Sequence, residues 1–214
     1  MRAPPACDAI DGEHLRTGAH LHRFGTGALA GSAVPLLQEI PGRISLLAPP
    51  AFAGLRAGLG GNGYLIPPLL GQAAAGATYE DEPLGSAASR SDAQAHAGNL
   101  ERMASLLRTA PAVQVAGVFA ATRCAAPDRL PLAGALPDVQ QALDRAAQLR
   151  GAHLPDLPRV QGLYCLAALG SRGLCLAALL AEAVAAQANG EPLPIGAREA
   201  AAVDPARFLL RRLR

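Results

Sequence analysis

The sequence predicts a mixed α+β and α/β fold, with an antiparallel sheet early in the chain and a strand, turn and helix late in it. Between residues 43 and 80, short β-like runs such as RISLLAPP are separated by Gly and Pro, and GGNGY at 60–64 supplies the Asn-Gly pair that a tight hairpin needs. Between residues 163 and 187, the apolar run LYCLAAL is followed by GSRG and by LCLAALLAEAVAAQ, which has the length and the Ala/Leu content of a helix.

The composition is that of a globular protein. Half of the 214 residues are apolar, which excludes a disordered chain. Aromatic residues make up 3% and Trp is absent, so we expect no surface on which nucleic-acid bases stack. The formal net charge is +2, and all 19 basic residues are Arg. This charge is too small to indicate a polyanionic partner by itself.

The cysteine and histidine patterns give no sign of a metal site. The four cysteines contain no C-x-x-C pair, and His14, His20 and His22 have no acidic or Cys partner at helical spacing. The start, MRAPPACDAIDGEHLRTG, has no continuous apolar segment and carries acidic residues early, unlike a secretory signal. We therefore expect reduced thiols, no metal and a cytoplasmic protein.

The stretch from residue 89 to 124 predicts a helix and then a strand. Ser91 and its neighbours supply N-cap residues, and the side chains that follow on one helical face are His96, Leu100, Met103 and Leu107. This helix is expected to end near Pro111, with His96 and Met103 as packing residues. The run AVQVAGVFAATRC then predicts a strand that ends in Arg123.

Two more helices are expected in the last third of the chain. One is short and covers residues 139–149. The other is capped by Asp204 and has Pro205 in its first turn, where the missing N–H costs nothing. The ending RFLLRRLR has four Arg in eight positions. Such a basic helix is usually a solvated face, and contact with phosphate is the alternative.

The apolar run from Leu163 to Gln187 has three physical interpretations: a membrane hairpin, a buried core, or a ligand site at the start of a helix. A membrane span needs about 20 continuous apolar residues, and Arg172 and Glu182 interrupt this run. A strand, a glycine turn and a helix fit better. Free N–H groups and the macrodipole then favour an anion or an electron-rich ring edge at residues 170–174. Ordinary α/β units need the same kind of turn for close packing, so both interpretations stay open.

Three segments together resemble a known family. They are GNGYLIPP with GATYEDE, then TRCAAPDRLPLAGALPD, and then GLYCLAALGSRGLCLAALLAEAVAAQANGEPLP with the ending DPARFLLRRLR. Over residues 36–214 the chain resembles the C-terminal part of the FAD-dependent oxidoreductase half of the bifunctional bacterial enzyme of tRNA methylaminomethyl-thiouridine biosynthesis. That half is one of the D-amino-acid-oxidase-like flavoproteins, alongside glycine oxidase.

The resemblance implies a C-terminal fragment of a D-amino-acid-oxidase-like FAD fold, with an antiparallel substrate-side sheet plus the last strand and helix of the FAD-binding domain. The division that it implies has four parts. Residues 1–35 form an irregular lead, 36–124 a substrate-side β-sheet domain with one helix, 125–190 a return into the FAD-binding domain, and 191–214 a basic C-terminal helix or tail.

The implied activity is the oxidative removal of the carboxymethyl group from carboxymethylaminomethyl-uridine at the wobble position of tRNA. FAD would take a hydride from the CH2 next to nitrogen, and the imine would hydrolyse to glyoxylate and aminomethyl-uridine. No general base is expected, because this chemistry needs mainly orientation and a deprotonated nitrogen. The implied partners are tRNA and FAD. Two further segments of the full enzyme, the FAD-binding segment and the methyltransferase, have no counterpart in these residues and are also implied as partners.

The resemblance assigns substrate binding to Arg123, Tyr64 and Arg172. The fork of an Arg suits a substrate carboxylate, and Tyr64 matches a tyrosine that closes the pocket. The residues that match the flavin-contacting turn are Gly170, Ser171, Arg172, Gly173 and Leu174. The candidates for tRNA phosphate are Arg207, Arg211 and Arg212. The structural alternatives are an Arg123–Asp128 ion pair, core packing by Tyr64 and an exposed turn residue at Arg172.

The sequence departs from the family in three places. We identify no G-x-G-x-x-G fingerprint anywhere in the chain, although the family normally opens with a Rossmann strand and this motif. IPGRIS stands where the family tends to have Arg-Gly-Gln-Val-Ser, and RCAAPD lacks the Thr that usually precedes the Pro. We therefore expect a truncated chain. The alternatives are an inactive remnant or interaction module, and an FAD-dependent oxidase of a free small amine such as glycine or sarcosine.

Overall fold

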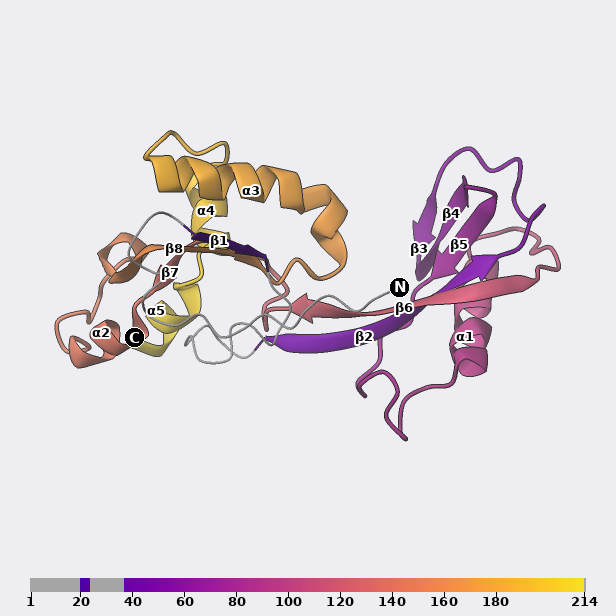
Figure 1. The fold of residues 1–214 in the computed structure, drawn as a ribbon, viewed down its shortest axis with the longest axis horizontal. Helices are drawn as coiled ribbons and strands as arrows, with labels where there is room; N and C mark the ends of the chain where they lie inside the picture. Colours follow the sequence, from indigo (N-terminus) through magenta and orange to yellow (C-terminus); the bar gives the residue numbers. More distant parts are fainter. Residues whose placement is uncertain (1–19, 24–36, 214) are drawn as a thin grey trace. The chain divides into compact units, whose positions relative to one another are not determined.

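The computed structural model describes residues 20–23 and 37–213 in two compact units (Figure 1). Unit 1 comprises Met1–Gln38 with Arg123–Arg214, and unit 2 comprises Glu39–Thr122. The chain therefore leaves unit 1, builds unit 2 and returns. Each unit is a mixture of strands and helices, as the sequence predicts, and each is described by itself.

Unit 1 is built on a three-stranded sheet of order β1-β8-β7. Strand β7 (Leu132–Pro137) is antiparallel to β8 (Arg159–Ala167). Helix α3 (Gly173–Asn189) lies along this sheet (Figure 1) and buries Leu180 and Val184 against Ala133 and Leu166. Gly190, at φ 71°, ends the helix in the left-handed conformation that glycine adopts without strain. The strand, turn and helix expected from Leu163 to Gln187 are thus present.

Strand β1 (His20–Arg23) differs from the expectation of an irregular lead over residues 1–35. It pairs with β8 in parallel, with His20 opposite Leu163 and Arg23 opposite Leu166. The segment HLHR has no hydrophobic alternation of its own, so only the long-range pairing with an apolar strand makes it a strand. His14 and the side chains of His20 and His22 lie outside the described part of the chain. The prediction that these histidines form no metal site therefore stays a prediction.

Helices α2 (Val139–Asp144) and α5 (Arg207–Leu213) contribute to a second core of unit 1. Helix α2 is shorter than the expected 139–149, and turns continue to residue 151. Helices α4 (Ala197–Val203) and α5 follow α3. The side chains buried together are Ala142, Leu149, Leu157, Ala206, Leu209 and Leu210. Helix α5 is therefore partly a core element, whereas the sequence suggested a solvated basic tail.

Unit 2 is a five-stranded sheet of order β3-β4-β5-β2-β6, and its hairpins confirm the antiparallel sheet expected after residue 43. The strands are β2 (Gln38–Leu47), β3 (Leu59–Gly61), β4 (Gly63–Leu69), β5 (Gln72–Gly76) and β6 (Val115–Ala125). Asn62 forms the turn between β3 and β4, as GGNGY predicts.

The prediction that the chain contains no G-x-G-x-x-G spacing is wrong, because three glycines at and directly before this hairpin have it: Gly58, Gly60 and Gly63. In a dinucleotide-binding unit the motif joins a strand to a helix, whose N-terminus faces the pyrophosphate. Here it joins two antiparallel strands, and Gly63 takes φ 141° at the turn. The spacing is therefore a feature of the hairpin and not a dinucleotide fingerprint.

Helix α1 (Asp92–Ala104) packs on the sheet of unit 2. Ser91 and Gln94 form a capping box at its start. Met103 is buried with Leu47 and Leu65, as the helical periodicity predicts. The helix ends at Ala104 rather than near Pro111, yet Leu107 still packs on the same core from the turn that follows.

Candidate functional site

Two of the three motif-bearing segments meet in unit 1 at the end of β6. Ala125 forms a β-bridge with Leu169, which directly precedes the glycine turn. A Cβ at Gly170 would lie 4.0 Å from the Cβ of Ala125. Arg123 is half-buried two positions before this bridge. The structure therefore brings the strand that carries Arg123 beside the turn 170–173.

The turn into α3 has an unusual backbone. Ala168 and Gly170 take φ 55° and 54°, in the left-handed region that non-glycine residues seldom adopt. A 3-10 turn, η4 (Gly170–Arg172), then leads into the helix, and the side chain of its N-cap residue, Arg172, makes no capping hydrogen bond. Leu174 is fully exposed. The start of a 17-residue helix thus presents backbone donors, the positive end of the macrodipole and an apolar side chain together.

Arg172 is an exposed residue of this turn. Its Nη1 donates to the main-chain oxygen of Arg129 at 3.3 Å. Arg129, at φ 58°, belongs to the loop between β6 and β7. The contact joins the GSRG turn to the loop RCAAPDRLP. Because its side chain is exposed, Arg172 can both hold this loop and reach an anion.

Asp128 in the same loop is paired with Arg207 of α5. Arg207 Nε and Nη2 donate to the two carboxylate oxygens, each at 2.9 Å, and Leu130 N–H donates to Oδ1 at 3.1 Å. The hydrogen bonds from Arg207 hold the pKa of Asp128 below its usual value, although burial acts to raise it. The partner of Asp128 is therefore Arg207, and not Arg123 as the structural alternative had it.

The three arginines expected to contact tRNA phosphate have different surroundings. Arg207 is only 5% exposed, donates to Asp128 and to the main-chain oxygens of Asp204 and Leu130, and stacks on Phe208. The phosphate role expected for Arg207 therefore does not hold in this structure. Arg211 is exposed, and its guanidinium lies 3.9 Å from Asp128 and 5.4 Å from the centre of the Phe208 ring. Arg212 is exposed.

Tyr64 lies in unit 2, on β4, and is half-buried. It is paired with Gly60 on β3 and with Gly76 on β5. Among the candidate residues, the structure thus groups Arg123, the turn 170–174 and the start of α5 in one unit, and it places Tyr64 in the other.

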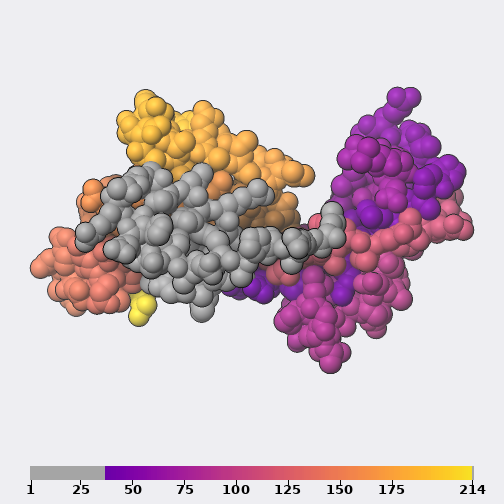
Figure 2. All heavy atoms as spheres, in the orientation of Figure 1, coloured from indigo at the N-terminus to yellow at the C-terminus, as the bar shows by residue number. Residues whose placement is uncertain are grey.

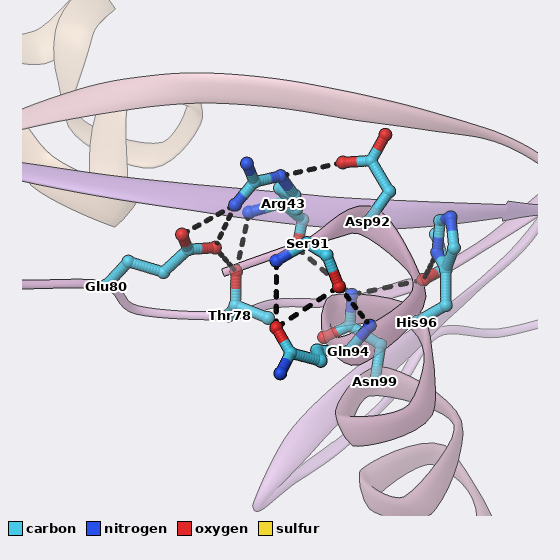
Figure 3. A network of polar contacts seen from close by, with 9 residues as sticks. Arg43, Thr78, Glu80, Ser91, Asp92, Gln94, His96 and Asn99 are labelled. Atoms are coloured by element: carbon cyan, nitrogen blue, oxygen red, sulfur yellow. Dashed lines mark hydrogen bonds and ion pairs between the residues drawn. The ribbon is translucent and has the colours of Figure 1, made fainter. Parts of the chain in front are cut away.

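Unit 2 also holds a buried ion pair that sequence reasoning missed (Figure 3). Arg43 Nη1 donates to both carboxylate oxygens of Glu80, at 2.7 and 2.6 Å, and Thr78 Oγ1 donates to Glu80 at 2.8 Å. Burial acts to raise the pKa of Glu80, but these hydrogen bonds together lower it. Arg43 Nε also lies 2.9 Å from Asp92 at the start of α1. The one sequence signal was the departure IPGRIS, which introduces this Arg.

The polar contacts continue from Arg43 into α1 (Figure 3). Asn99 Nδ2 donates to the main-chain oxygen of Arg43 and to Ser45 Oγ, each at 3.1 Å. Ser45 Oγ lies 2.7 Å from His96 Nδ1. This Ser and His resemble a nucleophile and its base, but Ser45 is 0% exposed, so no substrate reaches it. The network joins β2 to α1, and His96 has a polar partner as well as a packing role.

One helix in the described part of the chain, Gly170–Asn189, is long and apolar enough to cross a membrane, by length and composition only. A core helix of a soluble protein passes the same test. Figure 2 shows α3 at the surface of unit 1 (orange), while Leu180, Ala183 and Val184 are buried against the sheet. The helix therefore has one face packed on the sheet and one outward face on which Leu174 and Leu179 are exposed.

The fold and this turn define a class of protein. The family described as "FAD dependent oxidoreductase" matches residues 17–187, so the chain belongs to that family of flavoproteins. The match begins before residue 36, where the resemblance was expected to begin, and it includes β1. FAD is the cofactor of the family, as the sequence analysis expected.

Curated relatives make the resemblance more specific. The chain is 45% identical over 190 residues to the "tRNA 5-methylaminomethyl-2-thiouridine biosynthesis bifunctional protein MnmC" of Cupriavidus metallidurans, covering 83% of this chain and 28% of that protein. It is 44% identical to the protein of the same name from Burkholderia mallei, covering 87% of this chain and 28% of that protein. The chain thus spans little more than a quarter of these relatives.

Solved structures agree on the fold. Glycine oxidase from Geobacillus kaustophilus superposes with a TM-score of 0.64 at 18% identity, covering 88% of this chain and 45% of that one. Iminodiacetate oxidase from Chelativorans sp. BNC1 gives 0.54 at 19% identity, covering 79% and 40%. The architecture is therefore that of part of a D-amino-acid-oxidase-like fold.

Proposed function

We propose that this chain is the substrate-side and C-terminal portion of an FAD-dependent oxidoreductase that removes the carboxymethyl group from carboxymethylaminomethyl-uridine in tRNA, releasing glyoxylate. The relatives at 44–45% identity support a modified uridine of tRNA as the substrate, rather than a free small amine such as glycine. The observation that carries the site is the Ala125–Leu169 bridge, which joins the strand of Arg123 to the GSRG turn.

The residues of the turn fit one edge of a flavin ring. The N–H groups at the start of α3, which the side chain of Arg172 does not cap, are donors for a carbonyl oxygen or a ring nitrogen, and the helix dipole favours electron density there. The exposed Leu174 offers an apolar contact for a ring. When bound, FAD supplies the two-electron acceptor for oxidation of the C–N bond. We assign the flavin contacts to Gly170, Ser171, Arg172, Gly173 and Leu174.

The substrate carboxylate needs a cation beside this turn. Arg172 is exposed at the turn itself, and Arg123 is half-buried on the strand bridged to it. A guanidinium binds a carboxylate bidentately and orients the adjacent CH2. We assign this role to both arginines and pocket closure to Tyr64. Arg172→Lys keeps the charge but loses the fork, so it separates orientation from attraction.

The test uses the chain loaded with FAD and mixed, without oxygen, with tRNA that carries carboxymethylaminomethyl-uridine. The expected result is loss of flavin absorbance at about 450 nm, a general flavin property, with release of glyoxylate. Unmodified tRNA is the matched control and should leave the flavin oxidised. Reduction by free glycine or sarcosine, but not by the tRNA, would identify a small-amine oxidase. No flavin retained after dialysis would identify a remnant or interaction module.

The remaining assignments follow from this function. We propose the cytoplasm as its place, because its tRNA substrate is there. We propose Arg211 and Arg212 as contacts for tRNA phosphate, because their side chains are exposed at the end of α5. The relatives are described as bifunctional, and we propose that a methyltransferase segment and an ADP-binding segment complete the enzyme.

A further inference from the structure

Tyr64 lies between two glycines in the sheet of unit 2, Gly60 on β3 and Gly76 on β5. Directly paired residues in antiparallel strands place their side chains on the same face. A Cβ at Gly60 would have nothing within 4 Å, whereas a Cβ at Gly76 would lie 2.6 Å from Oη and 2.7 Å from Cζ of Tyr64. The tyrosine ring therefore lies over Gly76.

We propose that Gly76 is a positioning residue, which sets the place of the Tyr64 hydroxyl by leaving room on β5 for the tyrosine ring. The inference rests on the proposed function, in which Tyr64 closes the substrate pocket. It deepens that function because it names the residue that fixes the tyrosine. An aromatic ring packed over a cross-strand glycine is a known stabilising arrangement in sheets.

We infer that the glycine is needed for space, because its φ angle does not require glycine. The φ angle of Gly76 is not positive, whereas the neighbouring Gly63 takes φ 141°. The φ angle of residue 76 is therefore open to an L side chain. The three atoms nearest to an added Cβ all belong to the ring and hydroxyl of Tyr64.

The backbone at Gly76 is held from the other side, so the ring must move when a Cβ is added. Gly76 is paired with Ile44 on β2. Two positions later, Thr78 N–H donates to the main-chain oxygen of Arg43 at 3.0 Å, and Arg43 N–H donates to Thr78 Oγ1 at 2.7 Å. Arg43 and Thr78, which make these two hydrogen bonds, are both buried. The end of a half-buried side chain yields more easily than a doubly paired strand.

The first experiment replaces tyrosine by 3-fluorotyrosine and records 19F NMR spectra of the full chain. The sequence has three Tyr, and Tyr64→Phe assigns the signal of Tyr64. Gly76→Ala is expected to shift that signal and to leave those of Tyr79 and Tyr164 in place. Gly60→Ala is the matched control, because it adds the same methyl group beside the same tyrosine into open space, and it should shift nothing. An unmoved Tyr64 signal in Gly76→Ala, or equal shifts in both variants, overturns the proposal.

A double variant keeps the test decisive if Gly76→Ala does not fold. In the Tyr64→Ala background the atoms at 2.6 and 2.7 Å are gone, so Gly76→Ala should then fold as well as Tyr64→Ala alone. Failure to fold in both backgrounds would show that Gly76 acts through something other than Tyr64, and the proposal would be wrong.

The second experiment separates this inference from the proposed function. In the FAD and tRNA assay, Tyr64→Ala and Gly76→Ala should each raise KM about tenfold, the effect of one lost polar contact, with kcat nearly unchanged. The double variant should show no further rise, and additive effects would contradict positioning through Tyr64. If Tyr64→Ala leaves KM unchanged, the pocket role of Tyr64 is wrong, while the 19F spectra still decide whether Gly76 places the ring.

Discussion

Asp128 and Arg207 lie 79 positions apart and are joined by two parallel hydrogen bonds of 2.9 Å. The pair ties the loop after β6 to the start of α5. That same loop receives the hydrogen bond from Arg172. The C-terminal arginine that looked like a phosphate ligand is therefore a structural support of the proposed flavin turn.

Breaking this pair should destabilise unit 1. Arg207→Ala leaves the Asp128 carboxylate, whose side chain is 17% exposed, without its main partner. We expect a loss of about 2–3 kcal/mol in the free energy of unfolding, below the range for a fully buried pair. Urea unfolding measures it. Arg212→Ala is the control, and an exposed Arg should change stability by less than about 0.5 kcal/mol. Equal effects of the two changes would contradict the structural role of Arg207.

The same pair predicts a dependence of stability on pH. The pKa of Asp128 is lowered in the folded protein by its hydrogen bonds with Arg207, and that of Glu80 is lowered by Arg43 and Thr78 against the opposing effect of burial. Carboxyls with lowered pKa contribute stability above their unfolded pKa, about 4, and lose it as pH falls through the lower folded value. Tm should therefore decrease as the pH is lowered beyond about 4. The decrease should be less steep in Asp128→Asn, whose Tm is already lower at neutral pH. Parallel curves for variant and wild type would exclude Asp128 as a contributor.

The ion pair of unit 2 gives a local prediction. Glu80→Gln removes the charge that faces the buried Arg43 guanidinium, and we expect a cost of about 2–4 kcal/mol. Hydrogen exchange should accelerate in β2 and in the segment directly after β5, where Arg43 and Thr78 hydrogen-bond to each other. Glu82→Gln is the matched control, because Glu82 is exposed. Unchanged exchange in Glu80→Gln would mean that the pair does not support the sheet.

The arginines of α5 should differ in tRNA binding. Arg211→Ala and Arg212→Ala are expected to weaken binding to every tRNA sequence and to reduce the salt slope by about one each. Arg207→Ala should mainly lower the free energy of unfolding, because the buried Arg207 guanidinium is paired with Asp128. Filter binding at several salt concentrations measures the slopes, with Arg56→Ala, an exposed Arg of unit 2, as the charge-matched control. A slope unchanged by both α5 variants would place the tRNA elsewhere.

Local sequence patterns predicted the elements whose cause is local. The Asn-Gly turn at Asn62, the N-cap at Ser91 and the glycine turn before α3 each depend on residues a few positions apart. Asp204 was also expected to cap the last helix, and it accepts the N–H of Ala206 at 2.7 Å. Spacing alone did not choose between a ligand turn and a packing turn.

Features that depend on distant partners could not be predicted in this way. Strand β1 exists through pairing with β8, some 143 positions on, as the register of His20 with Leu163 gives (163 − 20). Arg43 meets Glu80 across 37 positions, and Arg207 meets Asp128 across 79. A charged residue in a sequence is as compatible with solvent as with a buried partner, so the burial of these arginines needed the structure.

The most direct test of the central claim is a 15N NMR titration of the chain with FAD. If the start of α3 contacts the flavin, the amide signals of Gly170, Ser171, Arg172, Gly173 and Leu174 should shift together and saturate. The same shifts should be weaker in Leu174→Asp, which places a carboxylate where the ring edge binds. Shifts confined to other residues, or none at millimolar FAD, would contradict the claim that this turn is the flavin site.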